Sequence, residues 1–168
     1  IIKYALDNGC NMINDITAGG IDNKNLELSL IYDVPIILMH MQGTPENMQI
    51  KPKYNSIIDD MILFFEKKIR LSLDIGLKKE NIIIDPGIGF GKSINDNYKI
   101  INNINKFKSL GFPVLIGVSR KSFLKYENDT PDDRLYSSLG AMSIAVYNGV
   151  DIIRVHDVLE TYKVLNVI

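Results

Sequence analysis

The sequence predicts an α/β fold of parallel strands and helices, and its polar residues favour a (β/α)8 TIM barrel over an open sheet. Short apolar runs alternate with longer amphipathic runs along the 168 residues. The strand-like runs are continuous Ile, Val and Leu, which is typical of parallel strands covered on both faces. Each of these runs ends in polar or charged residues. In a barrel all strand ends meet around one mouth, whereas in an open sheet only loops beside one crevice share a site.

Five strands, each followed by a helix, are expected in chain order. The strands are predicted at 10–16, 35–40, 81–85, 113–118 and 151–155. The helices are predicted at 1–8, 23–32, 55–74, 95–110, 130–148 and 157–167. The helix at 55–74 is the clearest, because its apolar residues recur at three- and four-residue spacing. Asn95 is expected to cap the fourth helix, and Thr130 with Pro131 and Asp133 to begin the fifth.

Five strands do not close a barrel, which typically takes about 250 residues. The chain also begins with a helix, at Ile1 rather than Met. We therefore expect residues 1–168 to be a single, N-terminally incomplete domain, a partial barrel of five βα units that lacks the first three.

Composition excludes several classes of protein. Hydrophobic residues make up 46% and charged residues 23%, as in ordinary globular domains. The net charge of -1 indicates no general attraction to nucleic acid or to an anionic membrane. No apolar run reaches the roughly 20 residues that span a bilayer. One cysteine, Cys10, and two histidines make a structural zinc site improbable and agree with a reducing, cytoplasmic location.

A glycine-rich segment, 85–93, follows the third predicted strand. It fails the phosphate-loop pattern, because Pro86 stands where that loop needs Gly, and it fails the dinucleotide pattern at Lys92. Asp85 ends the strand, where its carboxylate can accept hydrogen bonds from the N–H groups of an amino-heterocycle. Glycines beside it let the backbone approach a flat ligand closely. The alternative is that Asp85 only caps the loop.

Cations follow the last two strands. Arg120 and Lys121, flanked by hydroxyls, can bind a carboxylate or a heterocycle oxygen, or can form a solvated basic turn. Arg154 and His156 share one strand face and precede a helix N-terminus, which indicates a phosphate site. The alternative for His156 is a structural pair with Asp157.

Two further strand ends carry weaker signals. Asn14 can offer both a donor and an acceptor to a pterin or purine edge, although an Asn-Asp pair more often makes a turn or a helix cap. His40 is more often a structural histidine than a base. Its neighbours Met39 and Met41 can form soft walls for a flat ring.

These segments together resemble the dihydropteroate synthases in order and spacing, from about Gly9 to the end. The matching segments are 13–15, 38–45, 85–92, 117–122 and 153–158. The resemblance implies a (β/α)8 barrel that condenses 6-hydroxymethyl-7,8-dihydropterin diphosphate with 4-aminobenzoate, releasing diphosphate in folate biosynthesis. It also implies that the intact protein uses Mg²⁺ as cofactor, forms a homodimer and is a target of sulfonamides.

The resemblance assigns roles residue by residue. The pterin would be bound by polar side chains and apolar walls, namely Asn14, Met39, Asp85, Gly89, Phe90, Gly117 and Lys121. The diphosphate would be bound by Arg154 and His156. The aminobenzoate would contact Phe90, Lys121 and Ser122, while Arg120 supports the site. Catalysis would fall to Asp85, Lys121, Arg154 and His156. No metal ligand is expected in this chain, since the family's magnesium-binding Asn lies upstream, and the chain alone is expected to be inactive.

Three other functions fit parts of the pattern. A corrinoid-linked pterin methyltransferase uses a related barrel but needs no diphosphate site, which Arg154 and His156 argue against. A non-catalytic partial barrel, acting as an interaction module, agrees with the missing front but not with the intact strand ends. An open-sheet nucleotide binder fails on the loop spacings.

Overall fold

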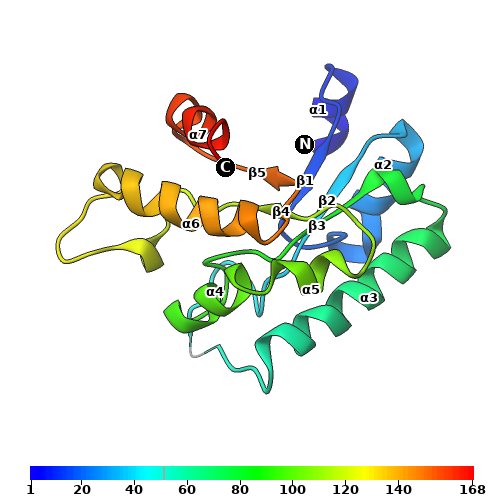
Figure 1. Cartoon of the computed structure of the whole chain (residues 1–168). Helices are drawn as coiled ribbons and strands as arrows, with labels where there is room; N and C mark the ends of the chain where they lie inside the picture. Colours follow the sequence, from blue (N-terminus) through cyan, green and yellow to red (C-terminus); the bar gives the residue numbers. More distant parts are fainter. Residues whose placement is uncertain (51) are drawn as a thin grey trace.

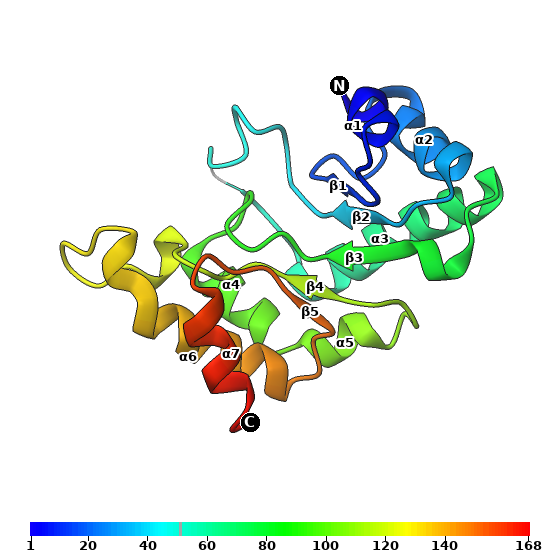
Figure 2. The same ribbon diagram turned by 90° about the horizontal axis from the view of Figure 1, so that it is seen from above.

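Five short strands form the centre of the molecule. In the computed structural model, which describes residues 1–50 and 52–168, they are β1 (Ile13–Asp15), β2 (Ile36–Met39), β3 (Ile82–Asp85), β4 (Leu115–Ile116) and β5 (Ile152–Ile153). All ladders are parallel, in the orders β1-β2-β3 and β4-β5, and a single parallel bridge from Ile84 to Val114 joins the two groups. The strands therefore lie side by side in chain order (Figure 2), which confirms the predicted partial barrel.

Helices connect the strands and cover them. They are α1 (Ile2–Asp7), α2 (Lys24–Tyr32), α3 (Ile57–Ile75), α4 (Ile94–Ile101), α5 (Ile104–Lys108), α6 (Leu135–Tyr147) and α7 (Val158–Leu165). Figure 1 shows α1 and α2 beside β1, and α6 and α7 toward the C-terminal end of the row of strands. None of these helices, over the residues described, is long and apolar enough to cross a membrane.

The longest helix, α3, forms where the sequence pattern predicts it. Met61 and Phe65 are fully buried on its inner face, one turn apart. Gly76 ends the helix with a φ of 107°. A left-handed residue at this position is a common helix terminator, and glycine adopts it without steric cost.

The predicted helix at 95–110 is two helices, and its predicted cap is wrong. Ser93, not Asn95, caps α4: its hydroxyl accepts a hydrogen bond from the Asp96 amide, and the Asp96 carboxylate accepts one from the Ser93 amide in return. The helix then ends at Ile101, and α5 begins after Asn103. Two adjacent asparagines separate the helices, in keeping with the low helix propensity of this residue.

The start of the helix predicted at 130–148 is also later than expected. Asp133 does reach back to the Thr130 amide and hydroxyl, as predicted. That contact closes only a 3-10 turn at Asp132–Arg134, and α6 itself begins at Leu135.

An apolar layer lies on the inner face of the strands. Ile37, Ile83 and Leu115 pack together there, with Ile152 against them. The residues between them along each strand face the larger core formed with the helices, for example Ile36, Ile82 and Ile116. Because side chains alternate along a strand, the residues two positions beyond the inner layer lie on the same face, nearer the strand ends.

Candidate functional site at the strand ends

The second layer of residues on the inner face of the strands contains charged side chains. Two residues beyond the apolar layer stand Met39 on β2, Asp85 on β3, Gly117 after β4 and Arg154 after β5. Met39 and Asp85 are direct partners in the parallel ladder. All four are among the residues that the sequence singles out, so strand alternation explains why they come together.

Asp85 is the buried acid of this layer. It is 1% exposed, and one carboxylate oxygen accepts a hydrogen bond of 2.7 Å from the Gly87 amide. Burial raises the pKa of Asp85, while that hydrogen bond and the positive charges of Arg154, Lys92 and Lys121 oppose the rise. Asp85 therefore does cap the loop, as the alternative interpretation held. Unlike an ordinary loop cap, it is also surrounded by three cations.

Arg154 extends over Gly117 toward Asp85. Its Nη2 lies 3.9 Å from the second carboxylate oxygen of Asp85. A Cβ on Gly117 would stand 3.1 Å from this Nη2, so glycine leaves room for the guanidinium. Arg154 also lines a hollow of about 270 Å³ with Gly117, Ser119, Lys121, Val155 and His156. Four of these six residues are predicted site residues.

Lys121 forms the other basic wall. Its Nζ lies 4.3 Å from the centre of the Phe90 ring, a cation–π distance. Its side chain also passes over Gly89, where a Cβ would meet the lysine Cδ at 3.3 Å. Burial lowers the pKa of Lys121, Arg154 adds to the shift, and Asp85 opposes it. Lys121, Gly89 and Phe90 thus form one continuous surface, as their predicted roles require.

His156 is held by a serine that the sequence interpretation left without a role of its own. The Ser119 hydroxyl oxygen accepts a hydrogen bond of 3.2 Å from the His156 amide and lies 3.0 Å from the ring Nδ1. Ser119 stands two residues beyond Gly117, as His156 does beyond Arg154, so alternation was the signal that could have found it. The pairing of His156 with Asp157, weighed as an alternative, does not form.

Arg120 turns away from the hollow. Its guanidinium binds both carboxylate oxygens of Asp157, at 3.2 and 2.6 Å, and also pairs with Asp132. Its φ of 59° is in the left-handed region, which reverses the chain between Arg120 and Lys121. The buried Arg134 donates to the Arg120 carbonyl and Ser138 accepts from its amide, so this strained position is fixed from both sides.

Two predicted residues lie at the border of the site. Asn14 is exposed on β1, in register with Ile37, and Ser122 is exposed at the start of a 3-10 turn. Neither lines the 270 Å³ hollow. A second hollow of about 260 Å³ adjoins Met39 and Met41, the two methionines expected as walls for a flat ring. It also includes Ile16, which the sequence interpretation did not assign to the ligand.

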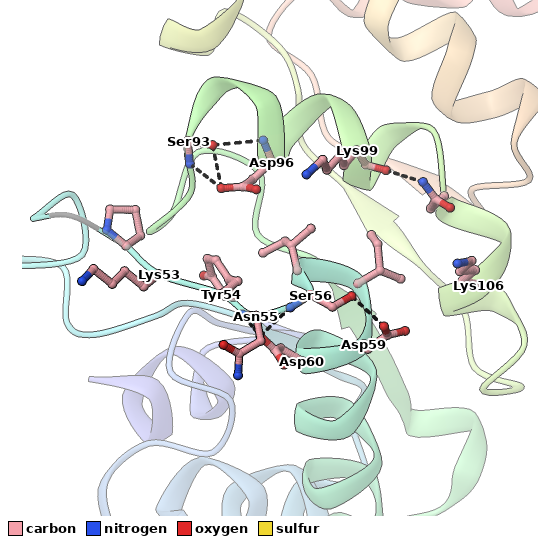
Figure 3. A pocket seen from close by; sticks show the side chains of 14 residues that line it. Lys53, Tyr54, Asn55, Ser56, Asp59, Asp60, Ser93, Asp96, Lys99 and Lys106 are labelled. Atoms are coloured by element: carbon pink, nitrogen blue, oxygen red, sulfur yellow. Dashed lines mark hydrogen bonds between the residues drawn. The ribbon is translucent and has the colours of Figure 1, made fainter.

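A larger hollow of about 810 Å³ lies elsewhere, between the starts of α3 and α4 (Figure 3). None of the predicted site residues lines it. Its polar side chains bind one another: Ser93 pairs with Asp96, and Ser56 with Asp59. We therefore take the mouth of the strands, not this surface groove, as the candidate site.

A magnesium site of the protein's own is not formed by the residues described. Within 1–50 and 52–168 no group of three or more His, Cys, Asp or Glu side chains can hold a metal ion. The nearest acid, Asp85, is buried and bonded to Gly87. The residues described therefore do not fit the ion.

Comparison with known proteins gives a consistent result. The family model described as "Pterin binding enzyme" matches residues 1–156. The dihydropteroate synthase of Haemophilus influenzae is 42% identical over 168 residues, covering 99% of this chain and 61% of that protein. That of Escherichia coli is 37% identical over 169 residues, covering 100% of this chain and 60% of that protein.

Solved structures agree. The Yersinia pestis dihydropteroate synthase in a sulfonamide drug complex matches with a TM-score of 0.94 and 35% identity, over 99% of this chain and 61% of that one. The Thermus thermophilus enzyme matches with a TM-score of 0.92 and 31% identity, over 99% and 66%. The chain thus spans about 60% of the length of the curated relatives it matches.

Proposed function

The chain belongs to the pterin binding enzyme family, and on that premise we propose that it forms the diphosphate-binding side of a dihydropteroate synthase. The reaction would join 6-hydroxymethyl-7,8-dihydropterin diphosphate to 4-aminobenzoate. One observation carries the proposal: the buried Asp85 carboxylate lies at the base of a mouth whose walls are Arg154, Lys121 and His156. An acid for the heterocycle thus stands next to a basic hollow for its diphosphate.

Asp85 would accept hydrogen bonds from the N–H groups of the pterin ring. Its free carboxylate oxygen faces Arg154, which would move to the diphosphate when the ligand enters. Hydrogen bonds that two N–H groups donate to a buried carboxylate are short and directional, so they would fix the plane of the ring. Met39 beside Asp85 and Phe90 below Lys121 supply apolar faces for it.

The substitution needs no protein nucleophile. The aromatic amine nitrogen attacks the methylene carbon of the pterin, a C–N bond forms, and the C–O bond to diphosphate breaks. The bonding electrons leave with the diphosphate, and the amine gives up one proton to solvent or to the leaving group. Arg154 and His156 would stabilise the developing negative charge, because preorganised donors act strongly on charge that grows in the transition state.

Mg²⁺, the homodimer and a cytoplasmic location stay predictions. Magnesium would be held by the substrate phosphates and by residues outside this chain. The exposed apolar residues Tyr147 on α6 and Tyr162 on α7 support an interface along these late helices. The exposed Cys10 agrees with a reducing compartment.

Calorimetric titration with 6-hydroxymethylpterin diphosphate and magnesium tests the proposal. We expect the chain to bind this ligand more tightly than a methylfolate, whereas a corrinoid-linked methyltransferase would prefer the methylfolate. Asp85→Asn should abolish binding, and Asp74→Asn, an exposed acid on α3, should not. The proposal is wrong if a chain that circular dichroism shows to be folded binds neither alone nor with the upstream strand–helix units supplied. Binding without turnover by the chain alone would agree with its expected inactivity.

A further inference from the structure

Lys92 is a buried cation that the proposed reaction does not use. It is 4% exposed, and its Nζ lies 2.8 Å from the Phe90 carbonyl oxygen, 3.2 Å from the His40 carbonyl oxygen and 3.1 Å from His40 Nδ1. A lysine ammonium has three N–H donors, so these three acceptors satisfy it fully. While Lys92 is protonated, His40 accepts at Nδ1 and therefore carries its ring proton on Nε2.

Stability alone does not explain this arrangement. Within the described residues no carboxylate oxygen lies within 4 Å of the Lys92 ammonium. A buried charge without a counter-ion is costly, and an apolar side chain of similar volume would usually be neutral or more stable. The lysine contributes something that an apolar residue cannot, namely three directed hydrogen bonds between two loops.

The two loops are pressed together at the backbone. A Cβ on Gly87 would lie 2.1 Å from the His40 carbonyl oxygen, and a Cβ on Gly91 would lie 2.8 Å from the Gln42 carbonyl oxygen. The glycine-rich loop after β3 therefore lies directly on the segment that follows β2. Lys92 joins the two from the buried side.

The end of this chain of contacts is Phe90. Lys92 holds the Phe90 carbonyl, and the Phe90 ring faces the Lys121 ammonium at 4.3 Å. We propose that Lys92 is a positioning residue, which fixes Phe90 against Lys121 and so shapes the aminobenzoate end of the site before any ligand binds. The identity of the ligand in this statement rests on the proposed function, while the control of Phe90 by Lys92 does not.

The pKa of Lys92 reflects its burial between the two loops. Burial lowers the pKa of Lys92 to about 7, and Lys121 adds to the shift. Asp85 on β3 and Asp96 on α4 oppose it. The pKa of the contacting His40 is lowered to about 3 by burial and by Lys92, so near neutral pH His40 accepts and does not compete as a cation.

Hydrogen–deuterium exchange without ligand tests the first half of the proposal. Lys92→Met keeps the length of the side chain and removes its donors. We expect faster exchange confined to the amides of residues 87–91, and no change in Lys99→Met, an exposed lysine on α4. Unchanged exchange at 87–91 overturns the proposal. Lys92→Arg keeps donors and charge, so if Lys92→Met does not fold, wild-type-like protection in Lys92→Arg supports the proposal and its loss overturns it.

A double-mutant cycle on ligand binding tests the second half. Pteroate carries the aminobenzoate group, whereas 6-hydroxymethylpterin diphosphate does not. We expect Lys92→Met to weaken pteroate binding about tenfold and diphosphate-ligand binding by less than threefold. Because Lys92 acts through Phe90, Lys92→Met should have no further effect in a Phe90→Ala background, since contacting residues are not additive. Equal losses for both ligands, or full additivity, overturn the proposal.

The two proposals fail separately. If the wild-type chain binds neither ligand, alone or with the upstream units supplied, the proposed function is wrong. The exchange experiment needs no ligand, and it then decides by itself whether Lys92 holds Phe90.

Discussion

The Arg154 guanidinium lies 3.9 Å from the Asp85 carboxylate, although Asp85 ends β3 and Arg154 follows β5. In the proposed complex the two side chains bind opposite parts of one substrate, the heterocycle and the diphosphate. Their contact in the free protein is long and only partly buried on the arginine side, with Arg154 43% exposed. The positive charge of Arg154 opposes the rise that burial causes in the pKa of Asp85, and so long a contact is readily exchanged for a ligand.

Replacing Arg154 should weaken binding of the diphosphate group much more than binding of the pterin ring. We expect Arg154→Gln to weaken the binding of 6-hydroxymethylpterin diphosphate at least tenfold, because a charge-assisted contact to phosphate is lost. The same ligand without its diphosphate should be affected less than threefold. Calorimetry measures both, and Arg70→Gln, an exposed arginine on α3, is the control. Equal losses for the two ligands would place Arg154 outside the diphosphate site.

Ser119→Ala tests the orientation of His156. The Ser119 oxygen accepts from the His156 amide, so its own hydrogen is free to donate to the ring Nδ1 and to leave the ring proton on Nε2. Loss of this hydrogen bond should weaken binding of 6-hydroxymethylpterin diphosphate about three- to tenfold, which is the effect of one net hydrogen bond. Nitrogen NMR of the only two histidines, His40 and His156, should show a changed tautomer balance for His156 alone.

The control for this variant is Ser143→Ala, which removes a similar hydroxyl from α6. It should leave both the affinity and the His156 signals as they are. A Ser119→Ala protein with unchanged His156 nitrogen shifts would show that the serine does not set the tautomer.

Gly87→Ala should be the most destabilising of three glycine substitutions. Gly87 has a φ of 67°, and its Cβ would lie 2.1 Å from the His40 carbonyl oxygen, so strain and overlap add to about 3 kcal/mol or more. Gly149 has a φ of 90° but open space, so Gly149→Ala should cost about 1–2 kcal/mol. Gly140 lies inside α6 with open space, and Gly140→Ala should stabilise by about 0.5–1 kcal/mol.

Urea unfolding ranks the three variants. An equal cost for Gly87→Ala and Gly149→Ala would mean that the loop moves away from His40 without resistance. The close contact would then not fix the site.

The sequence predicts the order of the elements and the site-bearing strand ends, because both follow from local patterns. Continuous apolar runs locate the strands, and alternation places Asp85 and Arg154 on one face. The runs overstate strand length, since β4 and β5 have only two ladder residues each. Hydrophobicity reports burial, and burial continues beyond the last hydrogen bond of a ladder.

Some features of the structure have a local signal in the sequence and others have none. The capping box of Ser93 and Asp96 is visible in the sequence as Ser-x-x-Asp, a local signal that favours Ser93 over Asn95 as the cap. The contact of Lys92 with His40 joins residues 52 positions apart and depends on how two loops pack. Arg120 turning to Asp157, 37 positions away, is likewise a tertiary contact. Arg120 itself has the left-handed backbone conformation, so its side chain reaches Asp157 while that of Lys121 lines the hollow.

The pH dependence of stability should reveal the buried Lys92. Its pKa is about 7 in the folded protein and 10.5 as the unperturbed value, so between these limits the unfolded chain binds more protons. Stability therefore rises with pH across this window, by up to about 1.4 kcal/mol per pH unit from this one group. Burial also lowers the pKa of Lys121, which therefore contributes with the same sign.

Only the difference in unfolding free energy between wild type and Lys92→Met isolates the contribution of Lys92. We expect that difference to grow in favour of the wild type from pH 7 to 9.5. Urea unfolding at four pH values measures it, with Lys99→Met running parallel to the wild type. A Lys92→Met curve that is also parallel to the wild type would mean that Lys92 keeps an ordinary pKa and is solvated, so that it does not join the two loops.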